Sequence, residues 1–146
     1  MLVVGVDSGT ATTGYGFVRE LPDGTLEAVD YGVFLTDPNQ SMPDRLLDLF
    51  EQLRNKLLLH NPEGGAVEKL YFQRNVTTAI SVGQARGVIL LALGQSHIPI
   101  EEYTTLSGDM TVKDAILALK ESFRSQMTTS RIMETGHRSV LVVDKF

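Results

Sequence analysis

The chain has 146 residues, of which 42% are hydrophobic and 21% charged, as is usual for a single globular domain. It contains no cysteine, which excludes disulfide bonds and thiolate metal sites and fits a reducing, cytoplasmic location. The net charge of −5 argues against a generic nucleic-acid-binding protein, because such proteins usually carry a basic surplus.

The charge is unevenly distributed along the chain. Residues 1–67 carry four Lys or Arg and ten Asp or Glu, whereas residues 68–100 carry three basic residues and one acid. A local basic strip can therefore hold phosphates on an otherwise acidic molecule. The N-terminus has no basic region or cleavage motif, so we expect no signal peptide. No apolar run reaches the roughly 18 residues that a membrane helix needs.

The N-terminal part predicts three strands in an antiparallel meander. The strands are expected over residues 2–6, 14–19 and 26–35, with a turn at Pro22–Gly24. The first is a continuous valine-rich run, which is typical of a strand buried on both faces.

The rest of the chain alternates helices with short strands. Helical spacing of leucine and phenylalanine predicts a helix over 43–59, ended by Asn61–Gly65. The segments that follow are expected to be strand 66–71, helix 76–93, strand 98–103, helix 112–123 and strand 140–143. This order indicates a mixed α/β domain with a hairpin edge and later parallel strands.

Two acidic residues lie at or near the ends of predicted strands. Asp7 follows the first strand and precedes the turn Ser8–Thr10, while Glu68 lies near the end of the strand at 66–71. If these strands are neighbours, the two carboxylates converge at one sheet edge and suit a hard cation such as Mg²⁺, which prefers oxygen ligands. The structural alternative is that Asp7 caps its turn and Glu68 is a solvated strand end.

The same turn also permits phosphate binding. Gly9, Gly14 and Gly16 would let backbone amides approach an anion. Sugar kinases and actin-like ATPases begin with a similar strand, turn and hairpin. An actin-like nucleotide-binding lobe is therefore an alternative, but that architecture needs two lobes around the nucleotide and this chain has room for one, which counts against it.

An aromatic pair follows Glu68 in a polar segment. Phe72 lies outside the strand pattern and can stack on an unpaired base, while Lys69 and Arg74 hold phosphates. Tyr71 is expected to pack into the core instead. The helix at 76–93 is apolar nearly all round, so it is either central to the core or shared with a second copy of the chain. His60 is given no role.

Three stretches together resemble the RuvC Holliday-junction resolvases. They are Val4–Thr10 with Thr13–Gly16, Ala66–Phe72 with Arg74–Asn75, and Ser81–Val88. Their order and separations also agree with that family, and the likeness covers roughly residues 1–104.

The resemblance implies an RNase H-like fold, with a mixed five-stranded sheet and helices on both faces. It also implies a homodimer that hydrolyses phosphodiesters in both strands of a four-way DNA junction during recombination and repair, using Mg²⁺ or Mn²⁺. It makes Asp7 and Glu68 catalytic metal ligands and Phe72 a stacking residue at the opened junction. Lys69 and Arg74 are expected at the DNA backbone, and a junction-migration helicase complex is an expected partner.

The last third departs from the family pattern. Ser8 replaces a proline that the family usually has, and the glycine-rich basic loop after Tyr103 is not recognisable. His137 matches the first position of the last metal-binding motif and is expected to be the third catalytic ligand, but Val140 stands where an aspartate belongs. Loss of acidic ligands weakens Mg²⁺ binding. A junction-binding protein with an incomplete metal site is therefore the first alternative to a nuclease.

Overall fold

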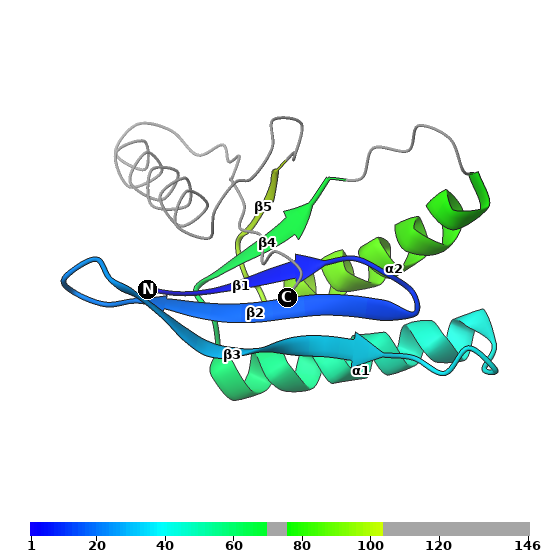
Figure 1. Ribbon diagram of the computed structural model, residues 1–146, viewed down its shortest axis with the longest axis horizontal. Helices are drawn as coiled ribbons and strands as arrows, with labels where there is room; N and C mark the ends of the chain where they lie inside the picture. The colour runs from blue at the N-terminus through cyan, green and yellow to red at the C-terminus, as the bar shows by residue number, and fades with distance from the viewer. Residues whose placement is uncertain (70–75, 104–146) are drawn as a thin grey trace.

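A computed structural model of the chain describes residues 1–69 and 76–103. Within these residues it contains the following helices and strands, shown in Figure 1: β1 (Leu2–Asp7), β2 (Thr12–Glu20), β3 (Leu26–Leu35), α1 (Met42–His60), β4 (Gly64–Glu68), α2 (Val76–Gln95) and β5 (Ile100–Tyr103). No helix in this part of the chain is long and apolar enough to cross a membrane.

The strands form one five-stranded mixed sheet in the order β3-β2-β1-β4-β5. β1, β2 and β3 pair antiparallel, as the predicted meander requires, because tight turns join them. β4 runs parallel to β1, and β5 parallel to β4. Each parallel step needs a crossover, which α1 and α2 supply. The mixed sheet predicted from the order of elements is confirmed.

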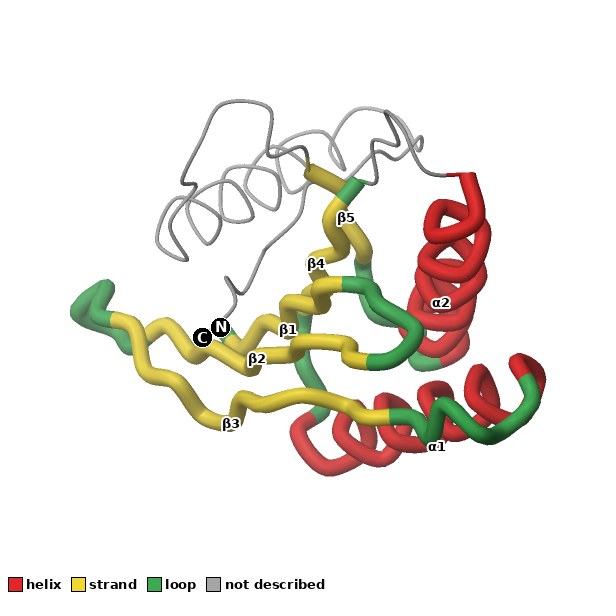
Figure 2. Tube along the Cα trace, turned by 45° about the vertical axis from the view of Figure 1, so that its right-hand side comes forward, coloured by secondary structure: helices red, strands yellow, loops and turns green. Residues whose placement is uncertain are grey.

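Both described helices cover the same face of the sheet, as Figure 2 shows from the side. Alternate residues of β1 point to that face, and they share one core with apolar residues of both helices. This core includes Leu2, Val4, Val6, Phe17, Leu49, Leu53, Val67, Ile89 and Leu93. The helix predicted over 112–123, which would cover the opposite face, lies outside the described residues, as does the strand at 140–143.

The ends of α1 follow local signals in the sequence. Ser41 is the N-cap and accepts a hydrogen bond from the amide of Asp44, and Pro43 occupies the first turn, where a missing N–H costs nothing. At the other end, Asn61 adopts a left-handed conformation with φ of 47°, and its N–H donates to the carbonyl of Leu57. The predicted boundaries 43–59 are therefore correct to within one residue at each end.

β4 begins and ends earlier than predicted. Gly64 and Gly65 looked like part of a helix terminator, but they are the first residues of the strand, which ends at Glu68 rather than Tyr71. A Cβ at position 65 would lie 3.2 Å from Ile98 Cγ2 and 3.3 Å from Leu93 Cδ2. The glycine thus allows α2 and the segment before β5 to pack directly against the strand backbone.

Candidate active site

Asp7 and Glu68 are the last residues of two adjacent parallel strands. The β1–β4 register pairs Val6 with Val67, so the two acidic residues follow at the same end of the sheet. Neighbouring strands lie about 4.8 Å apart. Val6 and Val67 belong to the core beneath the helices, so the alternation of side chains directs both carboxylates to the opposite face. Figure 1 shows β1 and β4 ending side by side.

The neighbouring strand β2 leaves space beside Asp7. Its residue opposite Asp7 is Gly14, and a Cβ there would lie 3.6 Å from the Cβ of Asp7. The glycine therefore places no side chain against the carboxylate. Both Asp7 and Glu68 are half-buried, and each makes polar interactions in the folded chain. Two half-buried carboxylates at the same end of two adjacent strands supply the oxygen ligands that Mg²⁺ or Mn²⁺ prefers.

The turn after Asp7 is held by hydrogen bonds to its carbonyl groups. The hydroxyl of Thr13 donates to the carbonyl of Gly9 at 2.5 Å, and the hydroxyl of Thr36 donates to the carbonyl of Thr10 at 2.7 Å. The amide of Thr36 donates to the next carbonyl, that of Ala11, at 3.3 Å. Three successive carbonyls of the turn thus have protein partners.

Thr36 is itself oriented by a charged residue from α1. Arg45 donates from Nε to the Thr36 hydroxyl oxygen at 2.9 Å, and Thr36 is 7% exposed. The Thr36 hydroxyl therefore accepts from Arg45 while it donates its hydrogen to the carbonyl of Thr10, which links α1 to the turn after Asp7. Neither Thr36 nor Arg45 could be predicted as a support of this turn, since no local pattern links residues this far from Asp7 to it.

The other predicted site residues fall in different parts of the chain. Lys69 directly follows Glu68 and is exposed. Phe72, Arg74 and His137 lie outside the described residues. Among the residues that the structure describes, no three His, Asp or Glu side chains gather closely enough to hold a metal ion.

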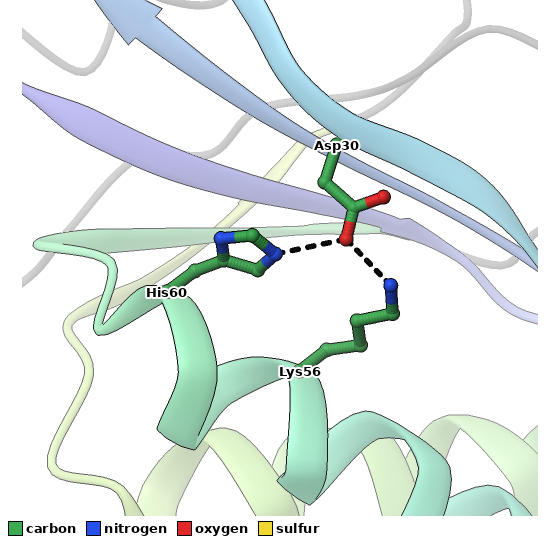
Figure 3. A network of polar contacts seen from close by, with 3 residues as sticks. All are labelled: Asp30, Lys56 and His60. Carbon is green, nitrogen blue, oxygen red and sulfur yellow. Dashed lines mark hydrogen bonds and ion pairs between the residues drawn. The ribbon is translucent and has the colours of Figure 1, made fainter.

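A second polar cluster lies on the helix-covered face and joins β3 to α1 (Figure 3). Asp30 Oδ2 is 2.6 Å from Lys56 Nζ and 2.8 Å from His60 Nε2. The His60 ring also packs on Phe17, with centroids 4.4 Å apart. His60, for which the sequence predicted no role, thus helps to attach the edge strand β3 to α1.

The contacts of this cluster change the acidity of its members. Partial burial raises the pKa of Asp30, but the hydrogen bonds from Lys56 and His60 outweigh that effect, so the pKa lies below its usual value. The hydrogen bond to Asp30 raises the pKa of Lys56. Both shifts favour the charged pair, which stabilises the contact between β3 and α1.

The family model for the crossover junction endodeoxyribonuclease RuvC matches residues 3–134. The chain belongs to the RuvC family. The RuvC of Petrotoga mobilis is 43% identical over 127 residues, which cover 87% of this chain and 75% of that protein. The RuvC of Roseiflexus sp. is 44% identical over 124 residues, which cover 85% of this chain and 71% of that protein. RuvC of T. thermophilus has been solved in complex with a Holliday junction substrate, and its structure superposes on this chain with a TM-score of 0.68. The superposition covers 94% of this chain and 84% of the T. thermophilus chain, with 25% sequence identity.

The RuvC match extends about thirty residues beyond position 104, where the recognisable motifs end. The segment without RuvC likeness is thus shorter than the motifs indicated. His137 and Val140 both lie beyond the matched range. Family membership also favours a junction nuclease over the actin-like lobe that the turn after Asp7 permitted.

Proposed function

We propose that this protein cuts four-way DNA junctions by metal-dependent hydrolysis of phosphodiester bonds, in recombination and repair. The observation that carries the proposal is the placement of Asp7 and Glu68 at the ends of adjacent parallel strands, on the same face of the sheet. Its support is membership of a family of crossover junction endodeoxyribonucleases, one of whose members has been solved with junction DNA.

Asp7 and Glu68 would hold Mg²⁺, with Mn²⁺ as a substitute, and His137 is the proposed third ligand. The donor set fits a hard divalent ion, because both described ligands are carboxylates. A bound ion supplies positive charge that stabilises the phosphate oxygens in the transition state. The contribution of Asp7 and Glu68 would be to place that charge at the adjoining carboxyl ends of β1 and β4.

Lys69, Arg74 and Phe72 are proposed to contact the DNA. Lys69 is exposed and directly follows Glu68 in the chain. A lysine in this place neutralises a phosphate beside the one that is cut. Phe72 would stack on a base exposed where the junction opens.

We propose further that the active protein is a homodimer that joins through α2. Ile80 and Leu91 of this helix are 60% and 55% exposed. Between them lie Gly83 and Gly87, which are also exposed and have no heavy atom within 4 Å of an added Cβ. Their spacing places all four on one side of the helix, where the glycines allow a second helix to approach closely. A two-fold dimer would present two sites to a symmetric junction.

The remaining proposals concern the setting of the molecule. Residues 1–146 would form one nuclease domain, which acts in the cytoplasm on branched DNA. A junction-migration helicase complex is the proposed partner there.

The proposal is tested with a labelled mobile four-way junction and a linear duplex of the same sequence, each incubated with Mg²⁺, Mn²⁺ or EDTA. We expect cleavage of the junction only, paired cuts in opposite strands, and no product with EDTA. Asp7→Asn and Glu68→Gln should each abolish cutting, because each removes a negative ligand. Glu51→Gln is the matched control, since this exposed carboxylate lies on α1.

Junction binding is measured in parallel by gel shift. Binding without cutting by the unaltered protein, with either metal, would replace the nuclease with a junction-binding protein whose metal site is incomplete. Equal binding of the junction and the linear duplex would contradict both the junction nuclease and the junction-binding protein.

A further inference from the structure

Arg86 of α2 connects the helix layer to the strand that carries Glu68. Its Nε donates to the main-chain carbonyl of Glu68 at 3.2 Å, and its Nη2 pairs with Glu102 Oε2 of β5 at 2.7 Å. The Arg86 side chain is 19% exposed, so the protein encloses most of it. One guanidinium group thereby joins α2, β4 and β5 at the end of the sheet where the carboxylates lie.

The geometry of the guanidinium makes these two contacts interdependent. Its nitrogens lie in one rigid plane, so the pairing with Glu102 limits the direction in which Nε can donate. That direction leads to the Glu68 carbonyl, whose position depends on the ψ angle of Glu68 at the last residue of the strand. Among the described residues the pairing of β4 with β5 extends to Glu68 and Tyr103, so this bond adds a restraint on the backbone at the last residue of the strand.

We propose that Arg86 is a positioning residue for Glu68. It holds the backbone of Glu68 so that the carboxylate stays beside Asp7 in the arrangement that binds the metal ion. The inference rests on the proposed function, because it assumes that Glu68 is a metal ligand. The ion pair with Glu102 is partly exposed, and such pairs contribute little to stability. The main role of Glu102 here is to orient the guanidinium.

Three variants distinguish the effect of the Arg86 bond to Glu68 from the effect of the Arg86 pair with Glu102. Arg86→Gln removes the guanidinium and both interactions. Arg86→Lys keeps a cation that can pair with Glu102 but lacks the planar fork, so it preserves the helix-to-β5 contact in a folded protein. Glu102→Gln is the matched control, because it removes the charge while its amide oxygen can still accept a hydrogen bond from Arg86, so the guanidinium keeps its orientation and its bond to Glu68.

Mn²⁺ binding is measured directly by electron paramagnetic resonance, together with thermal melting and with kcat and KM on the four-way junction. Small displacements of a catalytic group cost large factors in rate, so we expect Arg86→Gln and Arg86→Lys to lower kcat about tenfold or more. Their Mn²⁺ affinity should fall as well, while KM for the junction changes little. Glu102→Gln should melt close to the unaltered protein, because a partly exposed ion pair contributes little to stability, and it should keep Mn²⁺ affinity and kcat close to normal.

Two results would overturn the inference about Arg86 without contradicting the proposed nuclease function. One is normal Mn²⁺ binding and kcat in Arg86→Lys, provided that the unaltered protein binds the ion. The other is an equal loss in Glu102→Gln, which would place the effect in the packing of α2 against β5. Absence of Mn²⁺ binding by the unaltered protein would contradict the proposed function, and this inference with it.

Discussion

Gly9 has no side chain at a point where the turn after Asp7 has no room for one. A Cβ built on it would lie 2.2 Å from the main-chain oxygen of Thr12. Real Cβ contacts essentially never fall below 3.0 Å, so Gly9→Ala requires a movement of about 0.8 Å or more. The clashing atom belongs to the backbone and cannot rotate away. The movement must therefore pass into the turn that joins Asp7 to β2.

The size of the effect follows from this displacement. Forcing an extra carbon into a packed site costs about 1–3 kcal/mol, which lowers the melting temperature of a domain of this size by about 4–12 °C. A displacement near 1 Å beside a catalytic group can cost about 100-fold in rate. We therefore expect Gly9→Ala to lose about two orders of magnitude in kcat on the junction while most of the protein stays folded at 25 °C.

The assay pairs melting curves with single-turnover cleavage, and Gly94→Ala is the control. Gly94 is exposed in the last turn of α2, with no heavy atom within 4 Å of an added Cβ. Alanine there should stabilise the helix by up to about 1 kcal/mol and leave cleavage unchanged. The reasoning is refuted if Gly9→Ala melts and cuts like the unaltered protein. That result would mean that the turn relaxes without moving Asp7.

Two further substitutions test other parts of the molecule. Asp30→Asn should destabilise the protein by about 1–2 kcal/mol at pH 7, because Lys56 and His60 lose a charged partner. The pKa of Asp30 in the folded protein lies below its unfolded value near 3.8. The stabilisation by Asp30 is therefore complete above this unfolded pKa and is lost as the pH falls through the lower folded pKa. Melting curves of both proteins should therefore converge at strongly acidic pH, and a constant difference would contradict the assignment. Leu91→Asp should turn the dimer into a monomer in sedimentation equilibrium, whereas Leu59→Asp, on the 72% exposed Leu59 of α1, should not. A monomeric unaltered protein would remove the α2 dimer proposal.

Much of the framework could be predicted from local patterns. The valine run of β1, the hairpin turns and the leucine spacing of α1 each depend on neighbours in the chain, and each was placed within a few residues. The β4 boundary was wrong because Gly64 and Gly65 carry the same signal in a turn and in a strand. Only their contact with Leu93 and Ile98 distinguishes the two cases.

The sequence by itself determined that Asp7 and Glu68 lie at or near strand ends, because their position after buried runs is a local property, whereas the structure ended β4 at Glu68. Only the tertiary structure decided that these strands are parallel neighbours in register, since pairing depends on the crossover through α1. It also decided that Thr36, Arg45 and Arg86 support the two strand ends. Hydrogen bonds between residues far apart in the chain leave no periodic trace, so folding must bring the partners together before they can be recognised.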